Sequence, residues 1–519
     1  AESVHDWVEN SHASTSLSWA EGMATGFLSQ GEDRTVVAVI GDGALTGGMA
    51  WEALDSIADQ QDLRLVIVVN DNGRSYTPTV GGLANQLAII RTDPHYEEAL
   101  DRMKRHVADK PLGKQVFGLM HAAKVGVKDA LIGNGIFSDL GIKYLGPVDG
   151  HDISSVERAL ELAKRYGHPV IVHVMTTKGK GFAAAEANEE DHFHAVGKID
   201  PVTGASLKAA GGASWTQAFA GAMVELGEKR PDVVGVTAAM LHPVGLAPFA
   251  ARHPDRVFDV GIAEQHAVTS AAGMAVAGLH PVVALYSTFL NRAFDQLLMD
   301  AGLHHEGVTI VLDRAGITGT DGASHNGMWD MAMCGIVPGL MLSAPRDCQH
   351  LVSVLNEAVD INDRPTVIRY SKDPMPDDIR VVASHDGLDV LRDGPGDGIL
   401  LVAHGQLCAP ALAAVDQLDF PVRVVSPRWS LPVCRGLIEE AAEARAVVSV
   451  EDGLVVSGLG SHLADALSRR GLWRPIRNLG IPQRYLGHDS RSAIMAELGL
   501  DAPGIADAVS QLVSQLGGE

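Results

Sequence analysis

Two stretches near the N-terminus decide the fold: Val36-Val-Ala-Val-Ile-Gly-Asp-Gly-Ala44 and Leu65-Val-Ile-Val-Val-Asn-Asp-Asn-Gly73. Each is a short apolar, β-branched run that ends in glycine and polar residues. Three times along the chain, such a run is followed by an amphipathic stretch, as expected when parallel strands are covered by helices. The sequence therefore predicts an α/β fold with mostly parallel sheets.

The alternation divides the chain into three blocks. A Gly/Ala-rich stretch at 203–213 predicts a linker before a helix that opens at Ser214 and Trp215, and the acidic segment 372–378 ends the second block. We expect domains over 1–205, 206–378 and 379–519. Residues 81–145 are predicted to be mostly helix and loop. The predicted strands are 35–40, 65–69 and 170–175, then 233–237, 281–286, 308–313 and 366–370, then 398–404, 421–426 and 446–451.

Composition excludes several classes of protein. With 519 residues the chain is long enough for about three or four domains, and its formal charge of -23 opposes binding to nucleic acid or to an anionic membrane. The sequence contains no run of 18 apolar residues. Its four cysteines form no CxxC pair, which favours a reducing compartment, and we expect a cytoplasmic protein.

The polar residues that follow the two opening strands predict a metal site. Asp42 and Asn72 come directly after apolar runs, and ligands of α/β sheets bind at the carboxyl ends of the strands. A carboxylate and an amide oxygen suit Mg²⁺, which completes its coordination with water and phosphate oxygens. Glycine at 43 allows close approach of a diphosphate, and a helix that begins near Gly47 would direct amides at it. The alternative is two ordinary turns.

Two further motifs lie in the second block. Glu264 stands at the head of a small-residue helix, 267–278, where an acid is otherwise a simple helix cap. The Gly-rich stretch Asp313-Arg-Ala-Gly-Ile-Thr-Gly-Thr-Asp321-Gly-Ala-Ser-His325 follows a predicted strand, where loops often carry function. Its plain alternative is a capping aspartate and a solvated histidine.

Together these motifs resemble the 1-deoxy-D-xylulose-5-phosphate synthase family of transketolase-like thiamine enzymes. Gly41-Asp-Gly43 through Asn72 is similar to the thiamine diphosphate fingerprint. The resemblance extends from about Asn10 to the C-terminus, through Gly146-Pro-Val-Asp-Gly-His-Asp152, Lys178-Gly-Lys-Gly-Phe182, Phe193-His-Ala-Val196 and Tyr286-Ser-Thr-Phe-Leu-Asn-Arg292. It implies decarboxylation of pyruvate and transfer of the two-carbon unit to D-glyceraldehyde 3-phosphate. It also implies thiamine diphosphate and Mg²⁺ as cofactors, a homodimer, and a role in isoprenoid, thiamine and pyridoxal biosynthesis.

The resemblance also implies a role for each matching residue. Glu264 would hydrogen-bond the aminopyrimidine ring of the cofactor and act in catalysis. His194, His325 and Asp321 are further catalytic candidates, the histidines for binding pyruvate or moving protons. The metal ligands would be Asp42, Asn72 and the carbonyl of Arg74, and the other cofactor contacts Ser11, His12, Ala13, Gly43, Ala44, Lys178 and Phe182. Tyr286, Arg292, Arg314, Asp321 and Lys372 would bind or orient the triose phosphate.

The sequence departs from the family pattern at three places. Ser11-His12-Ala13 stands where the family usually shows Gly-His-Ser, and Lys372 stands where an arginine is frequent, which removes a bidentate fork for phosphate. About a hundred residues that precede this segment in the family, with two histidines near the cofactor, are not in the sequence. Because a proton-handling histidine contributes on the order of 10²–10⁴-fold in rate, we expect such a shortened chain to turn over slowly.

Two other functions stay open at this point. A transketolase that moves ketol units between sugar phosphates shares the Gly-Asp-Gly, glutamate and Asp-Gly-x-Ser-His elements, although not the motif at 146–152. A non-catalytic cofactor-binding fragment is the second alternative, motivated by the histidines that the sequence does not contain.

Overall fold

The computed structural model describes residues 3–8, 10–82, 85, 87, 140–189, 191–194, 196–207 and 213–517. These residues form two compact units. The first contains residues up to Leu207 together with Gly261–Ala263, and the second contains the rest of the chain. Most of the segment 81–145 and the linker residues 208–212, which the sequence singled out, lie outside the described residues.

The first unit is built on a four-stranded parallel sheet with the order β1-β2-β4-β3. Its described elements are α1 (Ser16–Ser29), β1 (Val36–Gly41), the 3-10 helix η1 (Ala44–Thr46), α2 (Gly48–Asp59), β2 (Leu65–Asp71), β3 (Lys143–Asp149), α7 (Ile153–Tyr166), β4 (Val170–Met175) and α8 (Ala183–Glu186).

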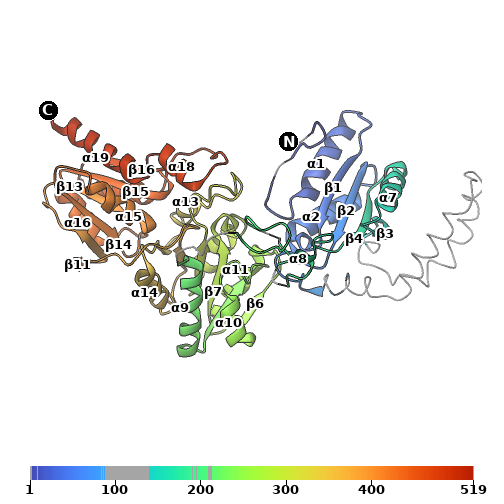
Figure 1. The fold of residues 1–519 in the computed structure, drawn as a ribbon, viewed down its shortest axis with the longest axis horizontal. Coiled ribbons are helices and arrows are strands. Elements are labelled where there is room, and N and C mark those ends of the chain that lie inside the picture. The colour runs from blue at the N-terminus through green and yellow to red at the C-terminus, as the bar shows by residue number, and fades with distance from the viewer. Residues whose placement is uncertain are drawn as a thin grey trace, which may run out of the picture. The chain divides into compact units, whose positions relative to one another are not determined.

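Helices cover both faces of this sheet, which explains its apolar strands. Leu17 of α1 and Leu54 of α2 share a core with Ile67, whereas Ala163 of α7 packs with Val66 and Val172 on the other face. Figure 1 shows α1 and α2 on one side of the strands and α7 on the other. The three strands predicted in this block, 35–40, 65–69 and 170–175, are therefore confirmed.

The predicted helix-and-loop segment 81–145 is wrong at its end, because β3 begins at Lys143. This strand contains Gly146 and Pro147 and is only half-buried at most of its positions. Residues of that kind are depleted in strands, so the sequence carries a weak strand signal there.

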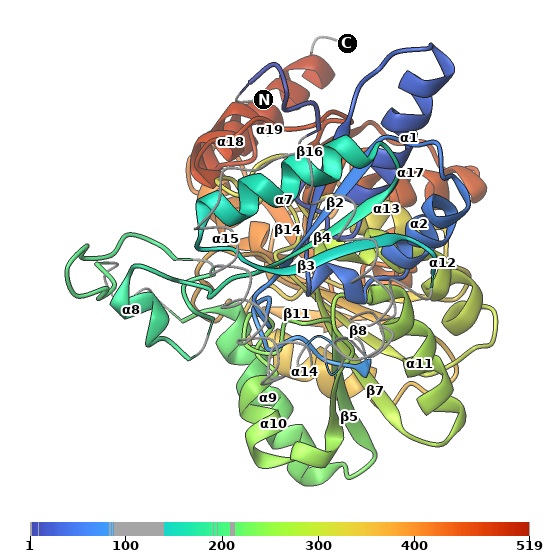
Figure 2. The same cartoon turned by 90° about the vertical axis from the view of Figure 1, so that its right-hand side faces the viewer.

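The second unit begins with a six-stranded parallel sheet in the order β6-β5-β7-β8-β10-β9. Its helix α9 starts after a capping box formed by Ser214 and Gln217, as the predicted helix start at Ser214 required. In Figure 2, α9 and α10 lie side by side next to β5. The elements are α9 (Trp215–Lys229), β5 (Val233–Thr237), α10 (Ala247–Arg252), η2 (Pro254–Arg256), β6 (Val257–Asp259), α11 (Glu264–Val276), β7 (His280–Tyr286), η3 (Ser287–Arg292), α12 (Phe294–Gln296), η4 (Leu297–Gly302), β8 (Thr309–Asp313), α13 (Asp330–Cys334), β9 (Met341–Ser343), α14 (Cys348–Ala358) and β10 (Thr366–Arg369).

A third sheet, also six-stranded, has the order β11-β12-β14-β13-β15-β16 and follows in the same unit. It is parallel except at β12, which pairs antiparallel with β11 and β14. Its elements are β11 (Ala383–His385), β12 (Leu388–Arg392), β13 (Ile399–Ala403), η5 (Gly405–Leu407), α15 (Cys408–Val415), β14 (Val422–Pro427), α16 (Arg435–Glu443), β15 (Ala446–Leu454), α17 (Leu459–Arg469), β16 (Ile476–Ile481), α18 (Arg491–Glu497) and α19 (Ala502–Gly517).

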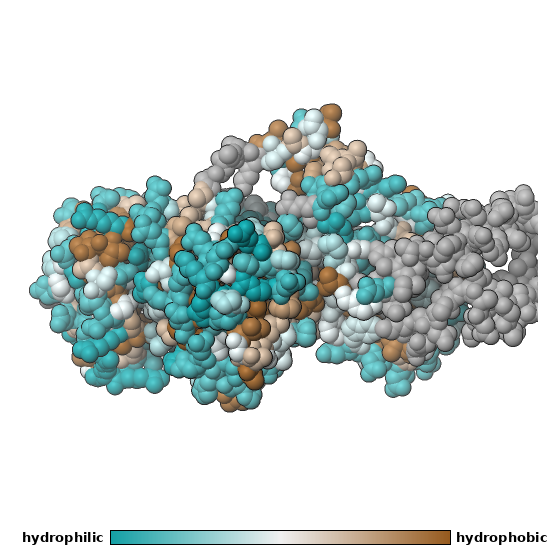
Figure 3. Space-filling model, turned by 90° about the horizontal axis from the view of Figure 1, so that it is seen from below, coloured by the Kyte–Doolittle hydropathy of each residue, from teal (hydrophilic) through white to brown (hydrophobic). Residues whose placement is uncertain are grey.

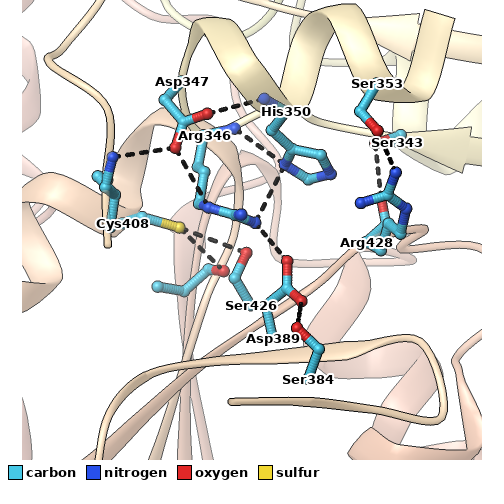
Figure 4. Close-up of polar contacts among 12 residues, drawn as sticks. Ser343, Arg346, Asp347, His350, Ser353, Ser384, Asp389, Cys408, Ser426 and Arg428 are labelled. Carbon is cyan, nitrogen blue, oxygen red and sulfur yellow. Dashed lines mark hydrogen bonds and ion pairs between the residues drawn. The ribbon is translucent and has the colours of Figure 1, made fainter. Parts of the chain in front are cut away.

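The two sheets of the second unit share one apolar core. Val283 and Leu312 of the first sheet belong to the same buried cluster as Val402 and Val425 of the other. Beside this core lies a buried polar network, drawn in Figure 4, in which Arg346 contacts Asp389 of β12 at 2.8 Å. These contacts explain why residues 213–378 and 379–517 form one compact unit although each carries its own sheet. The division into three domains stays a prediction.

Among the described residues, no helix has the length and apolar character needed to cross a bilayer. The face shown in Figure 3 is mainly hydrophilic, with apolar side chains in small, separate groups. A mainly hydrophilic face agrees with the formal net charge of -23.

Candidate functional site

The first group of predicted site residues gathers at the carboxyl ends of β1 and β2. Asp42 follows β1 and is 1% exposed. Its carboxylate accepts hydrogen bonds from the backbone amide of Asn72 at 3.3 Å and from the Thr79 hydroxyl at 2.5 Å. Asn72 Oδ1 in turn accepts from the Arg74 amide at 3.1 Å. The structure therefore brings Asp42, Asn72 and Arg74 together, as the parallel register of Gly41 against Asn70 requires.

The turn after β1 is tightly packed. A Cβ on Gly43 would lie 3.1 Å from the Cβ of Ser75, so a larger residue would displace the neighbouring loop. The Ser14 hydroxyl donates to the Ala44 carbonyl at 2.6 Å, and the Thr46 hydroxyl donates to the Gly43 carbonyl at 2.6 Å. Ser14 thus joins the segment that contains Ser11, His12 and Ala13 to this turn.

Lys178 and His194 form a second group in the same unit. Lys178 Nζ lies 2.5 Å from His194 Nδ1 and 2.5 Å from the Ser75 carbonyl, and the His194 ring lies 4.1 Å from the Tyr76 ring. Burial, reinforced by the charge of Arg74, lowers the pKa of Lys178 from 10.5 to about 8. Burial, and then Lys178, likewise lowers the pKa of His194, which favours its neutral form. Phe182 lies close by in sequence, with its ring 5.9 Å from that of Phe193.

These residues fit a magnesium-bound diphosphate. The donor set consists of hard oxygens, and the cramped glycine at 43 keeps backbone within reach of an anion. Within the part of the chain that the structure describes, no cluster of three His, Cys, Asp or Glu side chains could hold a metal. The predicted set does not depend on such a cluster, because it combines one carboxylate with an amide and a backbone carbonyl.

Glu264 is the first residue of α11 and is 5% exposed. Burial raises the pKa of its carboxyl group, and a backbone hydrogen bond and the charge of Arg292 oppose this rise. A carboxyl group in this state holds a proton more readily than one in water. It is therefore suited to share a proton with a ring nitrogen.

The remaining predicted residues come together at the carboxyl ends of β7, β8 and β10. Asp321 accepts from Lys372 Nζ at 2.6 and 2.8 Å and from Arg314 Nη1 at 3.4 Å, and the Arg314 guanidinium lies 4.0 Å from the centre of the Tyr286 ring. We call Tyr286, Arg314, Asp321 and Lys372 the acceptor cluster. The negative charge of Asp321 is thus paired with two positive charges, those of Arg314 and Lys372.

His325 is linked to the acceptor cluster through an aromatic side chain. The ring of Phe289 lies 5.9 Å from the Tyr286 ring and 5.9 Å from the His325 ring. Arg292, by contrast, interacts electrostatically with Glu264. The loop that carries Arg314 is strained at that residue, whose φ of +58° is uncommon for a side chain other than glycine.

The sequence reasoning missed three polar partners. Thr79, which binds Asp42, lies in a segment without a recognisable motif. His173 of β4 contacts Asp71 of β2 at 3.0 Å and the Tyr144 hydroxyl of β3 at 2.6 Å, and no local sequence pattern indicates contacts between separate strands. A signal existed for this network, because a histidine inside the apolar run of β4 needs a polar partner when it is buried.

Comparison with known proteins adds independent findings. A family model described as 1-deoxy-D-xylulose-5-phosphate synthase matches residues 1–176. Models of the transketolase pyrimidine-binding domain and the transketolase C-terminal domain match residues 211–377 and 388–505. These models account for all three sheets.

Two curated relatives extend over nearly the whole chain. The 1-deoxy-D-xylulose-5-phosphate synthase of Cutibacterium acnes is 93% identical over 519 residues, which are all of this chain and 83% of that protein. The 1-deoxy-D-xylulose-5-phosphate synthase 2 of Kitasatospora griseola is 54% identical over 99% of this chain and 83% of its own length. Among solved structures, a split-gene transketolase described as an inactive β4 tetramer is 29% identical, with a TM-score of 0.51, over 58% of this chain and 98% of its own.

Proposed function

The chain belongs to the 1-deoxy-D-xylulose-5-phosphate synthase family of thiamine diphosphate-dependent, transketolase-like transferases, and from this premise we propose its reaction. Pyruvate is decarboxylated and its two-carbon unit is transferred to D-glyceraldehyde 3-phosphate, which gives 1-deoxy-D-xylulose 5-phosphate and carbon dioxide. The product would serve isoprenoid, thiamine and pyridoxal biosynthesis. The observation that carries this proposal is the acceptor cluster, in which Arg314 and Lys372 both contact Asp321 and the Arg314 guanidinium lies over the Tyr286 ring.

The first unit supplies the groups for the cofactor in this proposal. Asp42, Asn72 and the Arg74 carbonyl would hold Mg²⁺, and Gly43, Ala44 and Lys178 would face the diphosphate. The segment Ser11, His12 and Ala13, and Phe182, would contact the remainder of the cofactor. Bound thiamine diphosphate supplies the electron sink for decarboxylation, which side chains alone do not provide.

The second unit supplies proton handling and recognition of the acceptor. Glu264, whose raised pKa favours a retained proton, would hold that proton at the pyrimidine ring. Arg314 and Lys372 would bind the acceptor phosphate, Tyr286 and Asp321 would orient its hydroxyl groups, and Arg292 would lie nearby. His194 and His325 would bind pyruvate or move protons at the acceptor carbonyl.

Two substrate pairs test the proposed reaction. Protein with Mg²⁺ and thiamine diphosphate is mixed with pyruvate and D-glyceraldehyde 3-phosphate, and separately with xylulose 5-phosphate and ribose 5-phosphate. We expect carbon dioxide and 1-deoxy-D-xylulose 5-phosphate from the first mixture only. Turnover of the second pair alone would identify a transketolase, and calorimetric cofactor binding without carbon dioxide release would identify a cofactor-binding fragment.

We further propose that the protein acts as a homodimer in the cytoplasm. Support for self-association is limited to the similar split-gene transketolase, which is described as a tetramer of one chain type. Sedimentation velocity of the purified chain tests the dimer, because a dimer has twice the mass of the 54.7 kDa chain.

A further inference from the structure

Asp452 of β15 is not a member of the acceptor cluster, but it contacts the loop that joins two of its members. The side chain is 2% exposed, and its Oδ1 accepts the backbone amide of Ile317 at 3.1 Å. Ile317 lies between Arg314 and Asp321 in the chain. Asp452 therefore binds directly the loop that carries two members of the acceptor cluster.

The second carboxylate oxygen of Asp452 connects to the neighbourhood of Lys372. Oδ2 accepts from Gln406 Nε2 at 2.7 Å and pairs with Arg491 Nη2 at 2.8 Å. Gln406 accepts a hydrogen bond from Ser371, and Arg491 pairs with Asp373. The two chain neighbours of Lys372, Ser371 and Asp373, are thus each connected to Asp452, Ser371 through Gln406 and Asp373 through Arg491.

Two further contacts fix the same arrangement. Arg491 Nη1 donates to the Ile317 carbonyl at 2.6 Å, so Ile317 is held at both its amide and its carbonyl. Gly316 has a φ of +75°, and a Cβ at that position would overlap the Asp452 carboxyl group. The close approach of loop and carboxylate therefore requires glycine.

From these contacts we infer that Asp452 is a positioning residue for the acceptor phosphate. It holds the loop of Arg314 and the strand end of Lys372 at a fixed separation, so that both cations can grip one phosphate group. This inference rests on the proposed function, because it assigns the acceptor cluster to a phosphorylated acceptor. Asp452 acts through its partners and makes no contact with the acceptor.

The test compares Asp452→Asn with a matched control, Asp389→Asn. Asp389 is also a buried aspartate of the third sheet that pairs with a buried arginine, but its partners Arg346 and Ser384 lie in other segments. Asparagine at 452 can still accept from Ile317, while its amide cannot accept from Gln406 or Arg491. We expect the KM for D-glyceraldehyde 3-phosphate to rise about tenfold in Asp452→Asn and to change less than about twofold in the control.

The second readout uses an acceptor without phosphate. For Asp452→Asn, kcat/KM should fall about tenfold for D-glyceraldehyde 3-phosphate and far less for D-glyceraldehyde, while the KM for pyruvate stays unchanged. An equal fall for both acceptors, or the same result in Asp389→Asn, would show a merely structural role and overturn the inference. If Asp452→Asn does not fold, Gln406→Ala removes the link from Asp452 through Gln406 to Ser371 and leaves the contacts of Asp452 with Ile317 and Arg491. This variant should raise the acceptor KM about threefold, and an unchanged KM would overturn the inference.

Binding separates this inference from the proposed reaction. Calorimetric titration of D-glyceraldehyde 3-phosphate into the full chain without pyruvate needs no turnover. Weaker binding to Asp452→Asn than to wild type supports the positioning role even if wild type forms no 1-deoxy-D-xylulose 5-phosphate. Equal binding to both proteins overturns it, whatever the reaction proves to be.

Discussion

The carboxyl ends of the strands carry different chemical groups in the two units. In the first unit, the carboxyl ends of β1 and β2 present uncharged backbone, the side-chain amide of Asn72 and two buried carboxylates, Asp42 and Asp71, of which Asp71 contacts His173. In the second unit, the ends of β7, β8 and β10 present arginine, lysine and aspartate that already pair with one another.

The two sets of groups are suited to different kinds of ligand. A site of glycines and hard oxygens suits a group that arrives with its own countercharge, as a metal-bound diphosphate does. A site of paired side chains suits a small, charged molecule that must be told apart from similar ones. Mutations that affect only one region should therefore separate cofactor binding from recognition and chemistry.

The largest effect is expected from Glu264→Ala, which alters the second unit alone. Removing the proton-holding carboxyl group should lower kcat by on the order of 10²–10⁴-fold, while the affinity for thiamine diphosphate with Mg²⁺ changes little. Steady-state kinetics and calorimetry on the same preparation measure both quantities. A variant with near-normal turnover would refute the role of Glu264.

Asp42→Ala should produce the converse result. Loss of a metal ligand should weaken Mg²⁺-dependent binding of thiamine diphosphate by at least the 10–100-fold that indirect support of a metal site is worth. Because Thr79 and the Asn72 amide also lose their acceptor, Asp42→Asn serves as the control that keeps the shape of the side chain. Unchanged affinity in a Mg²⁺ titration would count against the metal site.

The third prediction concerns the buried polar network beside the shared core of the second unit. Burial, then the charges of Arg346 and Arg428, lowers the pKa of His350 from 6.5 to about 3. Below pH 6.5 the unfolded chain therefore binds a proton at His350 that the folded chain does not bind. The free energy of unfolding consequently decreases as the pH falls from 6.5 toward 3, by about 1.4 kcal/mol per pH unit.

His350→Asn tests this dependence by removing the titrating group. Between pH 6 and pH 4, the free energy of unfolding of the second unit should fall less steeply in the variant, by about 1.4 kcal/mol per pH unit. Denaturant unfolding of the full chain, followed by tryptophan fluorescence, measures both slopes. Parallel slopes for variant and wild type would show that His350 is accessible to protons in the folded state.

The smallest effect is expected from Lys372→Arg, which restores the bidentate fork that the family pattern shows. The acceptor KM should fall by about threefold, because arginine can offer two parallel hydrogen bonds to phosphate. The KM for pyruvate serves as the internal control and should stay the same. A raised acceptor KM would mean that the compact ammonium group of lysine is required beside Asp321.

Much of this molecule could be predicted from sequence because its parallel strands are buried on both faces. Apolar runs such as Val233–Thr237 and Val170–Met175 leave a strong signal, and their strands were predicted with the observed bounds. The short strands Val257–Asp259 and Met341–Ser343 contain too few residues for any periodicity. The β11–β12 hairpin was missed although Asp386-Gly387, both with positive φ, is a strong turn signal.

In the candidate site, too, the residues with a local sequence signal could be predicted and the others could not. The motif residues could be selected because Asp42, Asn72 and Arg314 directly follow strands, Glu264 begins a helix, and Asp321 lies in the Gly-rich loop after β8. Asp452 and Gln406 could not, because their importance comes from contacts between residues 46 and 135 positions apart in the sequence, and no local pattern indicates such contacts. Family resemblance supplied the roles, whereas the structure supplies the partners.

The carboxylate of Asp321 acts as an internal counterion for the two cations of the acceptor cluster. With Arg314 and Lys372 each contributing one positive charge and Asp321 one negative charge, the three side chains sum to plus one before any substrate arrives. Under the proposed function, a dianionic phosphate would compete with Asp321 for both cations, and a neutral sugar would not. Because Asp321 contacts both cations without a substrate, their side chains already lie near one another before binding, which lowers the entropic cost of ordering them.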